Sequence, residues 1–363
     1  MIHDIVTKIR RPTPYLAIET EKVVDAVQSF QKSFGVKNVY YAIKANPDKS
    51  IVSLLNKLKC NFEVSSAGEL KTIVNLEIPA SRIISASSIK NLDFIKAAYK
   101  AGIRYFTADS TSEIEMIACH APGSKISIRL NVSNEGSEWP LSRKFGVDSE
   151  EGVQLLERAK QTGLIPWGLS FHVGSQCTRL ATWVEAIDTA RIFWNMAASK
   201  SLHLKSLNLG GGFPIQYKKP VIGIDDIANT VFENIKKKMP PIQEIIVEPG
   251  RAIIGQAGTM VSSLIAKANR DGKKWFYLDV GVFNGLMESI GGIKYTMLVN
   301  GQGPKIKCVL AGPSCDGFDV IDMEAELPDI KIGEHVYILS TGAYTTAYAS
   351  KFDGSPIPKI VLI

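Results

Sequence analysis

Short apolar runs alternate with longer amphipathic stretches between about residue 39 and residue 250 of this chain. The apolar runs are rich in β-branched and aromatic residues, as buried strands are, and the stretches between them repeat their apolar positions at helical spacing. The pattern predicts helices that include residues 69–76, 112–118, 150–161, 181–198 and 225–238. It predicts eight strands, at residues 39–45, 61–65, 82–86, 105–109, 125–131, 166–173, 204–209 and 244–248.

Strands that alternate with helices indicate a parallel α/β architecture. We favour a (β/α)8 TIM-like barrel over an open doubly wound sheet, because the strand–helix unit repeats eight times in order. After residue 250 the pattern changes to strands at 257–267, 275–279, 306–311 and 334–340, joined by Gly-, Pro- and Asn-rich turns. This is typical of a β-sandwich or β-barrel domain. We expect a cofactor-binding barrel over residues 20–252 and a β-rich domain over residues 253–363, with residues 1–19 packed against the latter.

Composition excludes several classes of protein. The 363 residues are 45% hydrophobic and 21% charged, which is ordinary for a globular protein with a sizeable core. The net charge of +6 comes from scattered Lys and Arg residues, and the one dense run, residues 236–238, ends a predicted helix, so we expect no nucleic-acid partner. The five cysteines have no paired or zinc-type spacing, and no stretch is apolar over the length of a bilayer. We therefore expect a cytoplasmic protein without a structural metal or membrane association.

The run of residues 39–46 (VYYAIKAN) is apolar except for Lys44 near its end. Burial of an isolated ammonium is costly, so in a dry site the amine loses its proton more readily and becomes a nucleophile. Lys44 is therefore a candidate for a Schiff base with a carbonyl compound, above all pyridoxal 5′-phosphate (PLP). The alternative is a lysine at a strand edge that extends its ammonium into water.

Two motifs follow the seventh and eighth predicted strands, where barrel enzymes commonly bind phosphate. Residues 208–214 (NLGGGFP) contain consecutive glycines, which let backbone N–H groups converge on an anion but also suit a tight turn. Residues 248–251 (EPGR) offer Glu248 to a ring nitrogen and a Gly–Arg turn to a phosphate. Taken alone, an ion pair between Glu248 and Arg251 is the simpler interpretation.

Three weaker motifs complete the set. Residues 171–175 (FHVGS) end the sixth predicted strand, so His172 could lie flat on an aromatic cofactor ring, although a buried histidine with a satisfied N–H is commoner. Residues 312–319 (GPSCDGFD) place a thiol beside carboxylates, and residues 342–348 (GAYTTAY) place a tyrosine in a loop of small residues. An isolated Cys or Tyr is usually part of the packing.

In their order along the chain, these motifs resemble those of the ornithine/lysine/diaminopimelate/arginine decarboxylases of the alanine-racemase-like PLP fold, with the ornithine branch nearest. The resemblance runs from about residue 14 to residue 354. It implies PLP as cofactor, a (β/α) barrel followed by a β domain, and a head-to-tail homodimer whose active sites lie at the interface.

The resemblance also implies roles for particular residues. Lys44 corresponds to the Schiff-base lysine, Glu248 to the partner of the pyridine nitrogen, and His172 to the ring stacked on the cofactor. Cys315 corresponds to the catalytic cysteine that enters from the other subunit and handles the proton at Cα. The rest of the implied cofactor site comprises Glu63, Glu69, Arg129, Ser175, Gly211, Gly212, Gly250, Arg251 and Tyr344. The implied substrate and dimer residues are Asp316, which grips a distal ammonium, Phe352, and the intersubunit pair Lys144 and Asp319.

One segment departs from the family pattern. Bacterial relatives carry acidic residues near the substrate after a GGLAE-like segment, whereas residues 284–294 (NGLMESIGGIK) have Gly291 and Gly292 there. Glu288 remains, as a candidate for binding substrate or for another role. The sequence thus predicts PLP-dependent decarboxylation of a basic L-amino acid: ornithine first, then lysine or arginine. The alternatives are a decarboxylase or racemase of a larger, atypical amino acid, and an inactive regulatory homologue.

Overall fold

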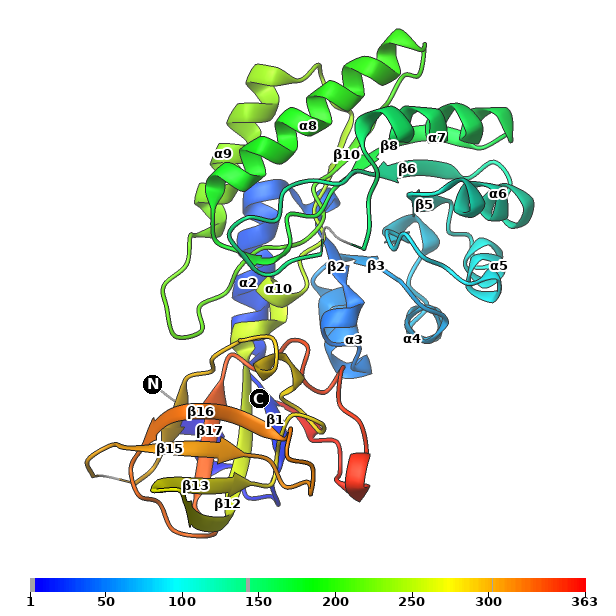
Figure 1. The fold of residues 1–363 in the computed structure, drawn as a ribbon. Coiled ribbons are helices and arrows are strands. Elements are labelled where there is room, and N and C mark those ends of the chain that lie inside the picture. Colours follow the sequence, from blue (N-terminus) through cyan, green and yellow to red (C-terminus); the bar gives the residue numbers. More distant parts are fainter. Residues whose placement is uncertain (1–3, 142–143, 302) are drawn as a thin grey trace. The chain divides into compact units, whose positions relative to one another are not determined.

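The computed structural model describes residues 4–141, 144–301 and 303–363, and Figure 1 shows its ribbon. The chain divides into two compact units. The α/β unit comprises Val27–Pro214 and Ile222–Gly250, and the β-rich unit comprises Met1–Ala26, Ile215–Val221 and Arg251–Ile363. Residues 1–3 of the amino-terminal segment, which the sequence predicts to pack with the β domain, lie outside the described residues.

Parallel strands in chain order form the centre of the α/β unit. They pair as β2–β3–β4 and as β5–β6–β8–β10–β11, and every pair in these two sheets is parallel. Single parallel bridges join Val39 to Val247 and Ser85 to Phe106, at the edges of the two sheets. The strands are β2 (Tyr40–Ala42), β3 (Asn61–Glu63), β4 (Ile83–Ile84), β5 (Tyr105–Ala108), β6 (Lys125–Arg129), β8 (Ile165–Ser170), β10 (Ser206–Asn208) and β11 (Glu244–Ile246). Because adjacent strands are parallel, their carboxyl ends emerge on one side of the sheet.

Helices connect these strands and lie outside them (Figure 1). Several begin at a side chain that accepts a hydrogen bond from a backbone N–H of the first turn: Asp48, Ser66, Asn91, Ser110 and Asp148. Such caps satisfy donors that have no partner within the helix. The helices are α2 (Thr20–Phe34), α3 (Lys49–Lys57), α4 (Ala67–Asn75), α5 (Leu92–Lys100), α6 (Thr111–His120), α7 (Ser149–Gln161), α8 (Leu180–Ser199) and α9 (Ile224–Lys238).

Side chains from strands across the α/β unit meet in its interior. Tyr40, Ile84, Tyr105 and Ile246 form one buried cluster. Close strand contact also requires a glycine at position 168, because a Cβ there would lie 2.2 Å from the carbonyl oxygen of Ser206 on the neighbouring strand. Packing of this kind gives the unit a rigid frame for the loops at the strand ends.

The β-rich unit is organised around one long strand, β12 (Gly258–Arg270). It pairs antiparallel with β1 (Tyr15–Ile18), with β17 (His335–Leu339) and with β13 (Lys273–Leu278). The remaining elements are β14 (Met297–Val299), β15 (Ile306–Ala311), β16 (Val320–Leu327) and β18 (Lys359–Leu362), with the short helices α1 (Asp4–Lys8) and α10 (Arg251–Ile254). Val6, Tyr15, Ala17, Val261 and Tyr337 form a buried cluster in this unit.

The predicted helices are confirmed as α4, α6, α7, α8 and α9, and the four strands predicted after residue 250 as β12, β13, β15 and β17. Helices α1, α2, α3, α5 and α10 and strands β1, β7 (Ser137–Trp139), β9 (Ser175–Cys177), β14, β16 and β18 were not among the predicted elements. In β16 the acidic residues Asp322, Glu324 and Glu326 alternate with apolar residues, a strand pattern that the prediction overlooked. The predicted first strand is too long, because β2 ends at Ala42 and Ile43–Ala45 form a 3₁₀ turn. Over the described ranges, no helix combines the length and apolarity needed to cross a membrane.

Candidate active site

Predicted site residues of the α/β unit gather at the carboxyl ends of its strands. Lys44 lies in the turn after β2, Glu63 ends β3, Arg129 ends β6, and Glu248 follows β11. The Lys44 ammonium lies 3.1 Å from Oε2 of Glu63, which is completely buried. Residues up to 204 positions apart in sequence, Lys44 and Glu248, therefore belong to one charged cluster, as expected for residues at one mouth of a parallel sheet.

The environment of Lys44 differs from the sequence expectation. Its side chain is 46% exposed, so the expectation of a buried, dry lysine is wrong for this structure. The cause is local: the 3₁₀ turn buries Ile43 and Ala45 and directs the residue between them outward. The ammonium nevertheless reaches the buried Glu63, so a proton acceptor lies beside the amine.

Glu248 is buried and its carboxylate is held by Asn208. The Asn208 amide Nδ2 donates a 2.5 Å hydrogen bond to Oε1 of Glu248, and Oδ1 of Asn208 accepts from the backbone N–H of Gly210. Burial and then the nearby Glu63 raise the pKa of Glu248 to about 7. Asn208 opens the glycine motif, and its role at the carboxylate was missed because the sequence does not show which side chains of neighbouring strands meet.

His172 is partly buried and is oriented by a hydrogen bond within its own loop. Its Nδ1 accepts a 3.0 Å hydrogen bond from the N–H of Gly174, so the neutral ring carries its proton on Nε2. Burial, Arg129 and Lys44 all lower the pKa of His172 well below its ordinary value. The structure therefore holds an uncharged imidazole at this position.

The glycines of the site lie where side chains would not fit. A Cβ at Gly211 would lie 2.9 Å from the carbonyl oxygen of Glu248 and 3.0 Å from Nε2 of His172. At Gly212, where φ is +103°, it would lie 2.5 Å from the carbonyl oxygen of Gly174. At Gly250 it would lie 2.9 Å from Cβ of Ala45, next to Lys44. The glycine loops therefore pack against the segments that carry His172, Glu248 and Lys44.

Glu69 and Ser175 lie on segments next to this cluster. Oε2 of Glu69, in the first turn of α4, accepts from the N–H of Ser65, whose hydroxyl donates to Oε1 of Glu63. Burial and then Glu63 raise the pKa of Glu69 to about 7. Ser175 begins β9 (Ser175–Cys177), which pairs with β7 (Ser137–Trp139).

The guanidinium of Arg129 is covered by an aromatic ring. It lies 4.8 Å from the ring centre of Phe145, a cation–π geometry. Burial lowers the pKa of Arg129, whereas the charges of Glu248, Asp109 and Glu63 raise it. Arg129 is therefore part of the same electrostatic cluster as Glu63 and Glu248.

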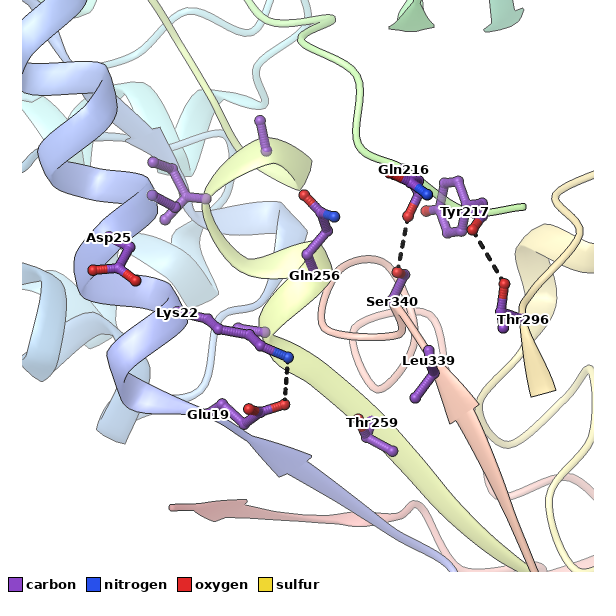
Figure 2. Close-up of a pocket in the computed structure, with 14 residues that line it drawn as sticks. Glu19, Lys22, Asp25, Gln216, Tyr217, Gln256, Thr259, Thr296, Leu339 and Ser340 are labelled. Atoms are coloured by element: carbon purple, nitrogen blue, oxygen red, sulfur yellow. Dashed lines mark hydrogen bonds and ion pairs between the residues drawn. The ribbon is translucent and has the colours of Figure 1, made fainter. Parts of the chain in front are cut away.

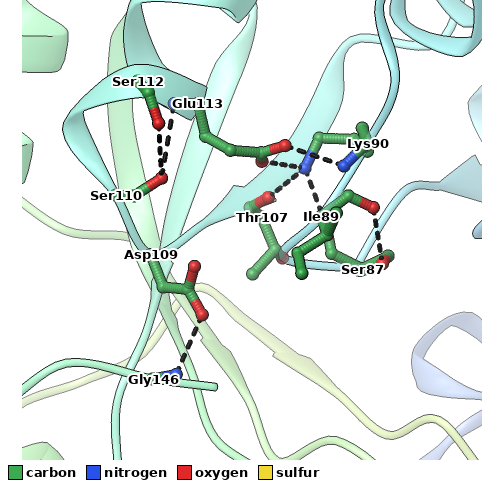
Figure 3. A network of polar contacts seen from close by, with 9 residues as sticks. All are labelled: Ser87, Ile89, Lys90, Thr107, Asp109, Ser110, Ser112, Glu113 and Gly146. Carbon is green, nitrogen blue, oxygen red and sulfur yellow. Dashed lines mark hydrogen bonds and ion pairs between the residues drawn. The ribbon is translucent and has the colours of Figure 1, made fainter. Parts of the chain in front are cut away.

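A buried ion pair that the sequence analysis missed supports this end of the sheet (Figure 3). Nζ of Lys90 lies 2.5 Å from Oε2 of Glu113 and donates to the carbonyl oxygens of Ser87 and Thr107, at 2.7 Å each. The other Glu113 oxygen accepts from the Lys90 backbone N–H. The pair ties the loop after β4 to β5 and α6. Lys90 stands in a polar segment, which offered no sign that its side chain is buried.

In the β-rich unit, Arg251 and Glu288 form a buried, bidentate pair. Nη1 of Arg251 lies 2.7 Å from Oε2 of Glu288, and Nη2 lies 2.6 Å from Oε1. The Arg251 guanidinium also lies 4.8 Å from the ring centre of Tyr344. The structure thus brings together three of the predicted residues within this unit, and both Glu288 oxygens are engaged with Arg251.

Four other predicted residues of the β-rich unit lie in its loops. Cys315 is exposed, and its N–H donates to Asp353. Asp316 is exposed and accepts from the N–H of Phe318. Asp319 is buried, and its carboxylate accepts from the N–H groups of Val282 and Ser314. Phe352 is 42% exposed and packs on Phe283, with ring centres 4.6 Å apart.

Lys144, the predicted partner of Asp319, lies in the α/β unit. Its side chain is exposed, and its ammonium lies 5.1 Å from the ring centre of Phe145. An ion pair between two subunits stays a prediction for Lys144 and Asp319. Within the described residues, no group of three or more His, Cys, Asp or Glu side chains is arranged to hold a metal ion.

Known proteins resemble this chain over nearly its whole length. A lysine/ornithine decarboxylase of Selenomonas ruminantium is 36% identical over 351 residues, covering 95% of this chain and 88% of that protein. The crystal structure of SrLDC with PLP and cadaverine superposes with a TM-score of 0.90 at 33% identity, covering 99% of this chain and 92% of that one. The arginine decarboxylase of Paramecium bursaria Chlorella virus, bound to agmatine, gives 0.92 at 27% identity and covers 99% and 100%.

Residues 20–255 match the family model described as pyridoxal-dependent decarboxylase, pyridoxal binding domain. This match covers well over half of the chain and includes the whole charged cluster of the α/β unit. The chain therefore belongs to the pyridoxal-dependent decarboxylases, and its cofactor is PLP.

Proposed function

We propose that this protein decarboxylates a basic L-amino acid with PLP and releases CO₂ and the corresponding diamine or agmatine-type amine. Ornithine and lysine are the first candidates, because the name of the Selenomonas relative gives both and cadaverine is bound in the SrLDC structure. Arginine is the next candidate, from the viral relative bound to agmatine. The observation that carries the proposal is the Lys44–Glu63 pair in the same cluster as Glu248 and His172.

The residues of the α/β unit fit the cofactor. We propose that Lys44 holds it covalently through its amine, that Glu248 faces the pyridine nitrogen and that the neutral His172 lies on the ring. We propose that the tightly packed loop of Gly211 and Gly212 presents backbone N–H groups to the phosphate, together with Ser175. When bound, PLP supplies an electron sink for the electron pair that the departing carboxylate leaves behind.

Proton movements can be assigned to the chain's own atoms. Lys44 must lose a proton before its amine is nucleophilic, and Oε2 of Glu63, 3.1 Å away, can accept it. Glu248, with a pKa of about 7, can hold or share a proton at the carboxylate oriented by Asn208. As CO₂ leaves, the C–C bond electrons stay with the substrate, and we propose that the Cys315 thiol delivers the proton that replaces the carboxylate at Cα.

The assignment of a basic substrate rests on Asp316. Its exposed carboxylate is the predicted partner of the distal ammonium, and a charge-assisted bond of this kind favours cationic over neutral side chains. The Gly291–Gly292 turn keeps open the alternative of a larger amino acid, decarboxylated or racemised, because a Cβ at Gly292 would meet no atom within 4 Å. An inactive regulatory homologue is the third possibility, and the presence of Lys44, Glu248 and Cys315 argues against it.

The architecture of the working enzyme is also inferred. We propose that residues 20–252 form a closed (β/α)8 barrel, supported by the Val39–Val247 and Ser85–Phe106 bridges, and that residues 253–363 with 1–19 form the β domain. A homodimer that shares active sites through Cys315, Asp316 and the Lys144–Asp319 pair follows from the family resemblance. A cytoplasmic location and a role in polyamine synthesis are part of the same proposal.

The test is purification followed by an absorbance scan and product identification with ornithine, lysine and arginine side by side. We expect a cofactor band near the visible range, CO₂ release, and one preferred diamine or agmatine. Lys44→Ala should remove the cofactor band, and a variant that stays yellow with PLP would refute the assignment of Lys44. Racemisation without CO₂ would favour the second possibility, and failure to bind PLP the third.

A further inference from the structure

Arg251 is held by two side chains that the expected cofactor contacts do not explain. Its Nη1 contacts both the Tyr217 hydroxyl, at 2.6 Å, and Oε2 of Glu288, and its Nη2 contacts Oε1 of Glu288. Two parallel N–H···O bonds from one guanidinium to one carboxylate fix the plane of both groups. A third hydrogen bond, from Nη1 to the Tyr217 hydroxyl, further restricts the orientation of the guanidinium.

Burial makes this arrangement persistent. Arg251 is 4% exposed and Glu288 is 2% exposed, so neither charge can turn to water without breaking the pair. Desolvation lowers the pKa of Arg251, but Tyr217 and Glu288 outweigh it, so the pKa lies above its ordinary value and the guanidinium stays charged. Both oxygens of Glu288 therefore have a charged partner within this unit.

Tyr217 is itself fixed on several sides. Its carbonyl oxygen accepts from the Thr296 hydroxyl at 3.1 Å, and its ring packs edge-on against Tyr295, with centres 5.6 Å apart. Figure 2 shows Tyr217 and Thr296 at the wall of a pocket of about 580 Å³ in the β-rich unit, where the Ser340 hydroxyl donates to the carbonyl oxygen of the adjacent Gln216. The backbone hydrogen bond and the ring contact thus hold Tyr217 in the position from which its hydroxyl bonds Arg251.

We propose that Glu288 and Tyr217 are positioning residues that orient the Arg251 guanidinium for the cofactor phosphate, and that Glu288 is not a substrate-binding residue. The inference rests on the proposed function and on the role in phosphate binding that the family resemblance implies for Arg251. A planar guanidinium recognises phosphate through a fixed fork of donors, so its orientation decides how well it binds. An acid and a phenol that hold Nη1 and Nη2 would fix the plane in which the donors of the guanidinium lie.

The test separates the phosphate from the rest of the cofactor. Full-length holoenzyme is resolved from its cofactor and titrated with PLP and with pyridoxal, which lacks the phosphate, and the two dissociation constants are compared. Glu288→Gln keeps the size of the side chain but presents amide donors to a group that has only donors. We expect it to weaken PLP binding by about tenfold, with pyridoxal binding changed by less than about twofold, because a charge-assisted hydrogen bond is lost.

Further variants guard against a general loss of structure. Tyr217→Phe removes only the hydroxyl and should give a smaller, parallel loss confined to PLP. Asp322→Asn is the matched control, because Asp322 is also a buried acid of this unit and pairs with Lys294 at 2.9 Å and Lys218 at 3.5 Å. It should leave the ratio of the two dissociation constants unchanged. In an Arg251→Met background, Glu288→Gln should have no further effect on that ratio.

The outcomes are distinct. A wild-type protein that does not bind PLP overturns the proposed function. A wild type that prefers PLP strongly over pyridoxal, together with an unchanged or increased preference in Glu288→Gln, overturns this inference alone. A rise in the amino-acid KM of Glu288→Gln with no change in the cofactor ratio would return Glu288 to substrate binding. A selective loss of PLP affinity in both the Glu288 and Tyr217 variants supports the positioning role.

Discussion

The side-chain amide of Asn208 donates a 2.5 Å hydrogen bond to the carboxylate of Glu248, from the end of one parallel strand to the segment that follows the next. The bond favours the ionised form of a carboxyl group that burial and Glu63 drive toward the neutral form. These opposing effects leave the pKa of Glu248 at about 7, in the range where a group can hold or give up a proton at physiological pH.

Removal of the Asn208 amide should raise the pKa of Glu248 further. We expect Asn208→Ala to lower the free energy of unfolding by about 1–3 kcal/mol, because a buried acceptor loses its donor. The loss should be greater at pH 8 than at pH 5, since only the ionised carboxylate depends strongly on the bond. Urea denaturation of the apoprotein at both pH values measures this.

Asn61→Ala is the control, because Asn61 is a buried asparagine at the opposite, amino-terminal end of a strand and bonds the Lys37 carbonyl oxygen. An equal loss at both pH values would contradict the prediction.

Glu248 and Glu69 should make the apoprotein less stable as the pH rises. Both have a pKa of about 7 in the folded chain, against roughly 4.3 for an unfolded glutamate. Between these values the folded state keeps protons that the unfolded state has released, so stability falls as pH increases through this window. Glu248→Gln should remove part of the slope, and its stability relative to wild type should rise from pH 4.5 to pH 7. A parallel pair of stability curves would show that Glu248 does not titrate there.

The Lys90–Glu113 pair should be essential to stability although it touches no predicted cofactor atom. Either Lys90→Met or Glu113→Gln leaves the other partner buried without its counterpart, at a cost of about 3–5 kcal/mol. The double variant Lys90→Met/Glu113→Leu should recover much of this, because no uncompensated charge remains. Arg158→Met is the comparison: Arg158 and Glu115 are 44% and 50% exposed in their pair, so its loss should cost less than about 1 kcal/mol. Thermal and urea unfolding measure the stability of each variant. A double variant whose loss of stability equals the sum of the two single losses would contradict the prediction.

Gly212→Ala should weaken cofactor binding through a steric clash, in addition to the strain of placing a side chain at a positive φ. The new Cβ would lie 2.5 Å from the Gly174 carbonyl oxygen and would push the glycine loop away from the segment that carries His172 and Ser175.

Gly163→Ala is a matched control, because its φ is also positive, at +81°, and nothing lies within 4 Å of its Cβ. We expect about 1 kcal/mol of destabilisation in the control, from the left-handed conformation alone. Retention of PLP during dialysis should fall at least about tenfold in Gly212→Ala and stay unchanged in the control. Equal retention in the two variants would rule out a role for the close contact.

Much of the architecture follows from local patterns that the chain carries in its order of residues. The boundaries of α7, α8 and α9 follow from helical periodicity, and β15 from an isolated apolar run, because both signals arise within a few neighbouring positions. The same holds for the position of Lys44 beyond an apolar strand. Strand β16 also carries a local signal, because Asp322, Glu324 and Glu326 alternate with apolar residues, but the prediction overlooked it.

The chemistry of the site depends on distances that no local pattern encodes. The order of residues alone pointed to Lys44, His172, Glu248 and the glycine motifs as candidates, since each ends a predicted strand. Only the tertiary structure decided that Lys44 is half exposed yet paired with Glu63, that Asn208 holds Glu248, and that Glu288 is committed to Arg251. The physical reason is that burial and side-chain pairing arise between segments brought together by folding, so the pKa and orientation of a group depend on neighbours far away along the chain.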